Sequence, residues 1–175
     1  SVNPANIYKT EQFFSFSKND WFVDTKGQKF SYLFKNKNNH KSYFSVETLI
    51  NDKIPIYGTI ANDSPLGYFD TYWHSVEYSQ AYHLDKLFDL KTNILIGYKI
   101  KLNLSKLYAE NIINYSFDVG FNKLFSENLS LGFVVNNLSS NFSSSTNNLY
   151  SDNPFLGIGL NYKIPKTYLD FSIDL

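Results

Sequence analysis

The sequence predicts an all-β fold, an antiparallel up-and-down transmembrane β-barrel, on three observations. Apolar residues alternate with small, polar or charged residues in one segment after another. Several of these segments run for about 9–12 residues, the length that a tilted membrane strand needs, whereas strands of soluble proteins average about 5–6 residues. If the strands run up and down, the longer connections fall mostly at one end of the sheet, as they do in outer-membrane barrels.

Alternation with a period of two defines each expected strand, because side chains at i and i+2 of a strand share a face. In 92–104 the apolar side chains occupy every second position from Ile94 to Leu104. The same pattern surrounds Phe117 and Phe171. The nine segments are 12–17, 29–36, 41–50, 67–82, 92–104, 112–123, 128–138, 155–164 and 168–175. One short helical turn is expected within 84–90.

A strand with one apolar and one polar face fits two folds. It packs its apolar face inward in a soluble sandwich, or turns that face to lipid in a barrel with a polar interior. The second fold places five apolar residues in lipid: Ile96, Ile100, Phe117, Phe133 and Ile173. It places six charged residues in the lumen: Glu77, Lys99, Lys101, Asp118, Asp170 and Asp174. We interpret these six as groups that hydrate the interior and pair across strands; the alternative is a catalytic or translocation set.

The connections between the expected strands differ in length. The long ones are 18–28, 51–66 and 139–154, and we expect them outside the cell. The short ones are 36–41, 124–127 and 165–166, of which we expect the last two in the periplasm, and 83–91 and 105–111 are intermediate. We expect Trp21 and Trp73 to be anchors at the membrane interface; a stacking site for a ligand is the alternative.

The connection before the fourth strand is unusually apolar. It and the residues that follow contain Ile54, Ile56, Tyr57, Leu66 and Tyr68, together with two prolines. An exposed apolar cluster usually marks an interaction surface. This segment is therefore a candidate partner-binding loop, and the alternative is a loop that folds inward and plugs the lumen.

Composition excludes several classes of function. The net charge is zero, so there is no electrostatic footprint for nucleic acid. The chain has no Cys, which excludes thiolate metal sites and a Cys nucleophile, and His40, His74 and His83 lack metal-ligand spacing. No nucleophile elbow or phosphate loop is present. We therefore expect one non-enzymatic domain over 1–175 with no metal and no cofactor.

Several short motifs resemble one family of outer-membrane barrels. Asn3-Pro4-Ala5 is similar to an Asn-Pro-Ala box near the N-terminus of these proteins, and the stretch FSFSKNDWFVD at 14–24 resembles their "sFsHneWFaDi". The segments IPIY at 54–57 and PLGYF at 65–69 resemble "eiPgyde…ptGsFsa". FDVG at 117–120 and LGFVVNNL at 131–138 are similar to "fDlG" and "lglvlqNlG". The family is that of the PorV/PorQ proteins of the type IX secretion system, which are related to the FadL fatty-acid transporters.

The resemblance implies a component of protein secretion in the bacterial outer membrane, with lipid, other secretion proteins and secreted cargo as partners. It also implies that the nine strands are part of a larger barrel of about 14, truncated at both ends. Two alternatives remain. One is a FadL-like channel for hydrophobic solutes, in which Asn3-Pro4-Ala5 belongs to an internal plug, and the other is a soluble all-β binding module.

Overall fold

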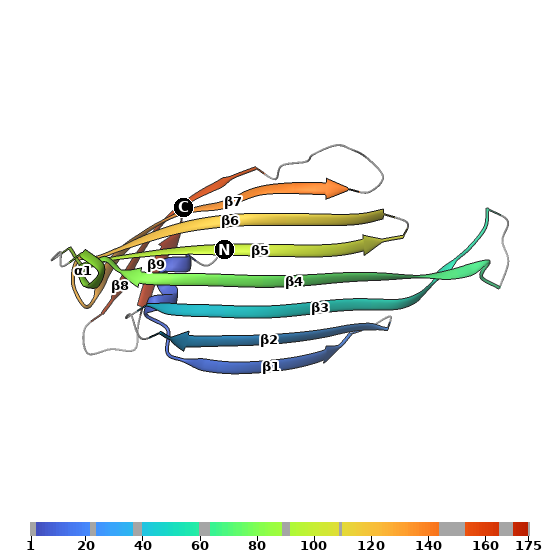
Figure 1. Cartoon of the computed structure of the whole chain (residues 1–175), viewed down its shortest axis with the longest axis horizontal. Helices are drawn as coiled ribbons and strands as arrows, with labels where there is room; N and C mark the ends of the chain where they lie inside the picture. Colours follow the sequence, from blue (N-terminus) through green and yellow to red (C-terminus); the bar gives the residue numbers. More distant parts are fainter. Residues whose placement is uncertain are drawn as a thin grey trace.

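The fold is all-β, as the sequence predicts. The computed structural model describes residues 3–21, 24–36, 40–59, 64–88, 92–108, 110–143, 153–164 and 170–174. Nine antiparallel strands form one sheet in the order of the sequence (Figure 1). They are β1 (Phe13–Asp20), β2 (Thr25–Lys35), β3 (Lys41–Ile56), β4 (Gly67–His83), β5 (Ile94–Leu107), β6 (Glu110–Leu124), β7 (Leu129–Ser143), β8 (Phe155–Lys163) and β9 (Asp170–Asp174). Each corresponds to one of the nine expected strands.

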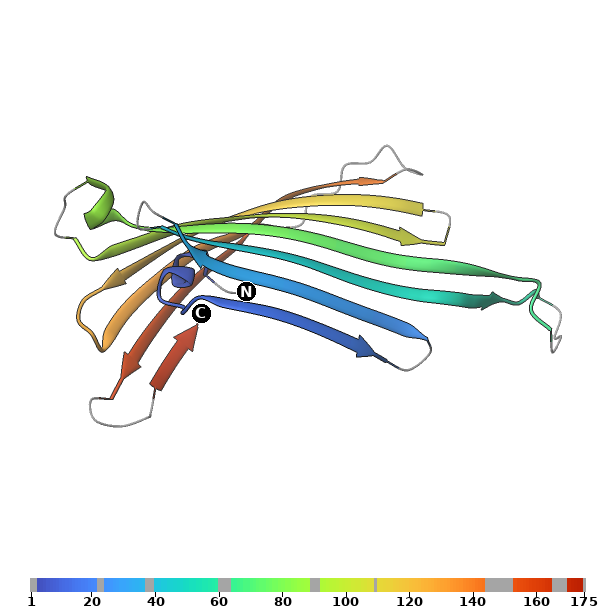
Figure 2. The same ribbon diagram turned by 60° about the horizontal axis from the view of Figure 1, so that its bottom comes forward.

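The sheet is open in the part of the chain that the structure describes. β1 pairs with β2 alone and β9 with β8 alone, so no pairing closes the sheet into a barrel. Two short helical elements accompany it, the 3-10 helix η1 (Pro4–Tyr8) and the helix α1 (Leu84–Phe88). The sheet curves around η1, which lies against one of its faces (Figure 2). None of the described helices is long and apolar enough to cross a membrane.

The polarity of the two sheet faces is inverted relative to a soluble protein. Among the described residues, the buried hydrophobic side chains are only Ala5, Leu33, Ala81, Leu95 and Val134. The buried polar side chains on strands outnumber them: Ser31, Ser42, Ser45, Ser75, Ser79, Gln80, Ser116, Asp118, Asn122, Ser130 and Asn136. The face away from η1 instead exposes large apolar side chains such as Ile100, which is 50% exposed. Burial of apolar surface in a core therefore cannot be the main source of stability here.

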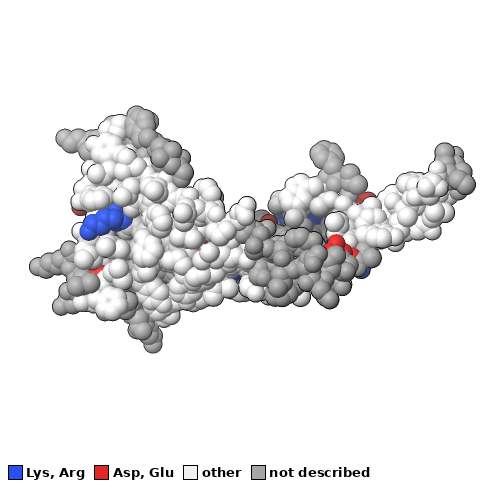
Figure 3. Space-filling model, turned by 90° about the horizontal axis from the view of Figure 1, so that it is seen from above, with Lys and Arg blue, Asp and Glu red and all other residues white. Residues whose placement is uncertain are grey.

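The exposed apolar side chains form a band that crosses the sheet. In the strand register, Ile100 lies beside Tyr78 and Phe117, so the apolar positions of neighbouring strands align. On β5 and β6 this face ends in polar residues at both ends, with Lys106 opposite Asn111 at one end and Lys123 at the other. Few charged side chains are visible across the middle of the surface in Figure 3.

Some polar side chains also lie within the band, and two of them are hydrogen-bonded to each other. Gln80 and Ser42 are paired residues on the apolar face. The Gln80 carbonyl oxygen accepts hydrogen bonds from the hydroxyls of Tyr82 and Tyr98, each at 2.7 Å, and its amide donates to Ser42 Oγ at 3.4 Å. Pairing of this kind removes most of the free-energy penalty of placing an amide in apolar surroundings.

A β-bulge on the opposite face holds a buried ion pair. At the shift between Phe117 and Val119, Asn136 and Asn137 oppose Asp118, and Asn137 has a φ of 64°. The Asn137 N–H donates to Asp118 Oδ1 at 2.7 Å, and Lys99 Nζ on the neighbouring strand lies 2.5 Å from Asp118 Oδ2. The bulge thus directs a backbone donor at a carboxylate that a cross-strand lysine neutralises.

Several expected connections are wrong because the strands are longer than the alternation. The expected long connection 18–28 is only 21–24, since Asn19 pairs with Gly27 and Asp20 with Lys26. The connection 105–111 is reduced to 108–109. Backbone pairing does not need an apolar side chain, so the ladder continues where the pattern ends.

The expected sorting of connections by length is also wrong. One end of the sheet carries 21–24, 57–66, 108–109 and 144–154, and the other carries 36–40, 84–93 with α1, 125–128 and 164–169. Each end therefore has both short and long connections. Much of 144–154 and 164–169 lies outside the described residues.

The buried ion pair leads to a test of the inverted sheet. Lys99→Met leaves Asp118 buried without its cation, and we expect a loss of about 3–5 kcal/mol in the free energy of unfolding. Lys99→Met combined with Asp118→Asn should recover most of that loss, because the amide oxygen still accepts from Asn137. Urea unfolding of each folded variant measures both values. A single variant that costs under about 1 kcal/mol would show that water already solvates Asp118.

Candidate functional site

The charged residues expected in the lumen lie on the buried face of the sheet where the structure describes them. Lys99 and Asp118 form the ion pair described above. Lys101 Nζ lies 5.4 Å from the centre of the Trp73 ring, and Glu77 Oε1 accepts a hydrogen bond from Ser79 at 3.3 Å. Asp170 and Asp174 are the first and last residues of β9, and their side chains lie outside the described part of the chain. These contacts are cross-strand or same-strand pairings and assemble no catalytic geometry.

The N-terminal segment is built into the same face. Asn3 caps η1, because its Oδ1 accepts a hydrogen bond from the Ala5 N–H at 3.0 Å. Its Nδ2 donates to the carbonyl oxygens of Phe121 at 3.0 Å and Phe133 at 3.1 Å. One side chain therefore both starts the helical turn and attaches it to β6 and β7.

Glycines make this close approach possible. Gly97 and Gly120 are direct partners on β5 and β6. A Cβ on Gly97 would lie 2.5 Å from the carbonyl carbon of Pro4 and 2.6 Å from the Ala5 nitrogen. A Cβ on Gly120 would lie 2.0 Å from Asn3 Oδ1. Only residues without a side chain allow the Asn-Pro-Ala segment to rest on the sheet backbone at this point.

Polar contacts extend the attachment beyond the glycines. Asn122 Nδ2 donates to Asn6 Oδ1 at 2.8 Å, and Lys9 Nζ donates to Asn122 Oδ1 at 3.4 Å and to Ser130 Oγ at 3.3 Å. Tyr8 accepts a hydrogen bond from Lys86 Nζ at 3.1 Å. The segment 3–9 therefore occupies the polar face as a fixed insert.

The second candidate site is the hairpin of β3 and β4, which extends beyond the rest of the sheet (Figure 1). β3 pairs with β2 only as far as Asn51, and β4 pairs with β5 only from Tyr72. Residues 54–56 and 67–69 therefore pair only with each other. A bulge at 52–53 marks the start of this projection, with Lys53 at a φ of 59° and its N–H bonded to Asp70 Oδ1 at 3.0 Å.

The five apolar residues of the candidate loop lie on this hairpin. Ile54 and Ile56 belong to β3 and are half-buried, so the expectation that they lie in a loop is wrong, because the β3–β4 ladder resumes after the bulge. Tyr57, Leu66 and Tyr68 are 58%, 73% and 61% exposed. Phe69 contacts Tyr108 of the β5–β6 turn, with ring centres 5.2 Å apart. The described part of the hairpin continues the strand direction and does not fold over the polar face (Figure 2).

The two edges of the projecting hairpin differ. On the β3 side, Pro55 has no N–H to offer and Lys53 interrupts the strand. On the β4 side, residues 67–71 include no proline, and no described strand pairs with them on the edge away from β3. Native proteins protect edges with prolines and bulges, so the β4 edge is the one left open to another strand.

The two tryptophans differ in position. Trp21 is half-exposed at the turn after β1 and packs near Gly27. Trp73 shares the face of Ser75 and Glu77, under Lys101. Its expected role as an interfacial anchor is therefore wrong, because the alternation of β4 turns it away from the apolar band.

Sequence reasoning missed the residues that hold the N-terminal segment. Gly97, Gly120, Asn122 and Ser130 lie on three strands and meet only through the strand register. The only signal was the recurrence of glycine or a small polar residue on the non-apolar face of consecutive strands.

Asp85 fixes the connection between β4 and β5. It accepts hydrogen bonds from the N–H and hydroxyl of Thr92 and from the N–H of Asn93, at 2.7–3.0 Å. Desolvation opposes its charge, but these bonds and His83 hold the pKa of Asp85 at about 2. The connection is thus organised around a permanently charged carboxylate at neutral pH.

The described residues show no group of three or more His, Asp or Glu side chains that could hold a metal ion. Comparisons of the chain with protein-family models, with curated proteins and with solved structures found no match.

The glycine contact leads to a test of the insert. Gly97→Val would place side-chain atoms against the backbone of Pro4 and Ala5, and we expect it to displace the segment and expose Lys9 to trypsin. Gly67→Val is the matched control, because a Cβ there meets nothing within 4 Å. Mass spectrometry of briefly digested, folded protein detects cleavage after Lys9. Equal cleavage in both variants would show that the segment is not held by this contact.

Proposed function

We propose that this chain forms part of an outer-membrane β-barrel that serves type IX protein secretion, without enzymatic activity, and binds secreted cargo or surface-attachment partners through the β3–β4 hairpin. The observation that carries the proposal is an apolar hairpin tip that lies beyond the end of the apolar band. The family resemblance supports the assignment to a secretion system, and the inverted sheet and the projecting hairpin support the membrane position and the binding surface.

The inverted sheet supports the membrane part of the proposal. A soluble sandwich would bury Ile100, Phe117 and Phe133 and expose Ser79, Ser116 and Asp118, and the observed burial is the reverse. Lipid is the solvent that stabilises an exposed apolar band of this kind. The hydrogen-bonded state of Gln80, within the band, agrees with a solvent that offers no partners.

The hairpin supports the partner-binding part. Polar residues end the apolar band of β5 and β6 at Lys106 and Asn111, and the tip extends past the paired row that contains them. Tyr57, Leu66 and Tyr68 would then be exposed to water. Contact with a protein partner would bury these apolar side chains and lower the free energy. The open β4 edge adds backbone donors and acceptors, the means by which an extended peptide joins a sheet.

A FadL-like channel for hydrophobic solutes is the second candidate function. The insertion of Asn3, Pro4 and Ala5 into the polar face favours it, because a segment in that place would close a lumen. In that case displacement of the segment raises solute permeability, and the hairpin variants below leave secretion unchanged.

The membrane proposal predicts a cost that depends on position. Ile100→Arg, in the middle of the band, should destabilise the protein folded in vesicles by about 2–4 kcal/mol, and Asn111→Arg, at the end of the band, by about 0–1 kcal/mol. In a soluble protein both exposed sites would tolerate arginine within about 0.5 kcal/mol. Equal small costs at the two sites would therefore eliminate the membrane proposal.

The hairpin predicts a loss of function without a loss of folding. Tyr57→Ser, Leu66→Ser and Tyr68→Ser, combined in the whole protein, should abolish secretion of a type IX cargo because the apolar contact is removed. Phe88→Ser with Phe125→Ser is the matched control, since these exposed rings lie at the opposite end of the sheet. Heat-modified gel mobility checks folding. Normal secretion by the triple variant would remove the hairpin from the mechanism.

A further inference from the structure

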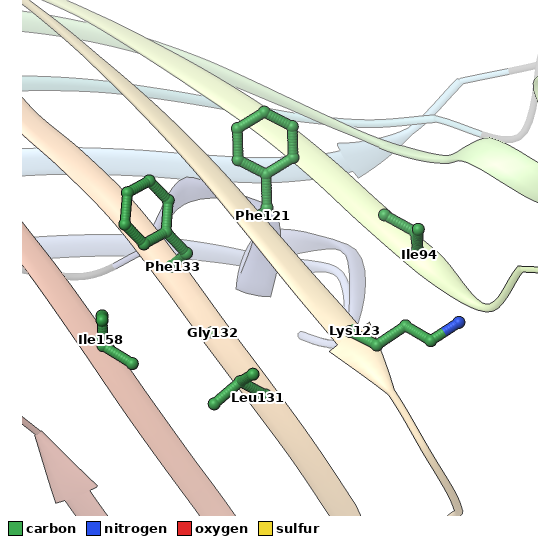
Figure 4. A pocket seen from close by; sticks show the side chains of 7 residues that line it. All are labelled: Ile94, Phe121, Lys123, Leu131, Gly132, Phe133 and Ile158. Atoms are coloured by element: carbon green, nitrogen blue, oxygen red, sulfur yellow. The ribbon is translucent and has the colours of Figure 1, made fainter.

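An apolar hollow of about 270 Å³ lies on the apolar face, on the side of the sheet opposite η1 (Figure 4). Phe121 on β6, Phe133 on β7 and Ile158 on β8 are consecutive partners in the register and form one wall. Ile94 and Leu131 form the other side, and Lys123 lies between them. The hollow therefore runs from the apolar band to the polar rim.

Lys123 gives this hollow a charged end. It is the last residue of β6 whose side chain lies on the apolar face, and its ammonium donates a hydrogen bond to the Thr92 carbonyl oxygen. That bond holds the ammonium at the rim and uses one of its three N–H donors. Within the described ranges, no carboxylate forms an ion pair with Lys123, and Glu127 in the following turn is exposed.

We propose that this hollow binds an anionic phospholipid, with an acyl chain along Phe121, Phe133 and Ile158 and the phosphate at Lys123. The inference rests on the proposed membrane position of the sheet. A cation at the end of an apolar groove complements a ligand that is anionic at one end and apolar along its length. The volume is below the roughly 300–1,000 Å³ of pockets that enclose a whole small molecule, which suits one part of an elongated chain.

The position of Lys123 also favours a lipid over a soluble ligand. Basic residues at the membrane surface attract anionic headgroups, and a long lysine stem reaches the headgroup level from an apolar position. The hollow opens on the apolar band, so a ligand reaches it from within the bilayer. A water-soluble anion would meet Lys123 but would leave the aromatic wall uncovered.

The test compares two lipids on the same folded protein. The whole protein is purified in detergent, exposed to phosphatidylglycerol or phosphatidylcholine, and analysed by native mass spectrometry. We expect about fivefold tighter binding of phosphatidylglycerol, and loss of that preference in Lys123→Gln. Lys106→Gln, at the opposite end of the band, is the matched control and should keep the preference. Ile158→Trp, which fills the hollow, should weaken both lipids.

The outcomes separate this inference from the proposed function. An unchanged preference in Lys123→Gln, or no preference in the unmodified protein, would overturn the lipid site while leaving the membrane proposal intact. Unchanged binding of both lipids by Ile158→Trp would equally overturn it. Failure of the unmodified protein to insert into vesicles would instead defeat the membrane proposal on which the site rests.

Discussion

The backbone ladder is the interaction on which this structure depends. Nine strands pair in one uninterrupted antiparallel order, while the buried side chains of their enclosed face are mostly serine, asparagine and aspartate. A sheet held in this way has no apolar core of the usual kind to stabilise it in water. Its stability therefore depends on the medium that covers the apolar band around Ile100 and Phe117. In the proposed membrane position, lipid would provide that cover and would also strengthen each backbone hydrogen bond, because it offers no competing partner.

The polar face of the sheet accepts the N-terminal segment because small residues of neighbouring strands lie side by side in the register. Gly97 and Gly120 remove side chains at the point where Pro4 and Ala5 contact the sheet, and Asn3 then reaches two strand carbonyls. Next to this contact, the bulge at Asn137 supplies a donor for Asp118. Both contacts, that of Asn3 with strand carbonyls and that of Asp118 with the Asn137 N–H, pair a side chain with a backbone group of the sheet. The N-terminal insert and the buried ion pair thus stabilise the same two strands, β5 and β6, from one side.

The sequence predicted the strands well because their signal is local, and predicted the sites poorly because theirs is not. A period of two survives in every strand, so all nine were expected. The expected strand boundaries are wrong at 18–28 and 51–56. There polar residues or a bulge end the alternation of side chains, but the backbone pairing continues. The contacts of Asn3 and Lys9 cross more than 110 residues of chain, and only the register brings them together. Trp73 shows the same limit. Its residue type suggests an interfacial anchor, but its position in the alternation of β4 places its side chain on the polar face.

The free edges of the sheet impose a further constraint. In an antiparallel sheet that follows the sequence, β1 and β9 run in the same direction, so pairing them would be parallel, unlike every pairing described here. An antiparallel closure takes an odd number of further strands between them. If the sheet lies in lipid as proposed, each unpaired backbone group costs several kcal/mol, and both edges then need a partner. The exposed apolar band and the open edges are therefore linked. A lipid medium would stabilise the apolar band, but it would also raise the free-energy cost of every unpaired backbone group at the edges.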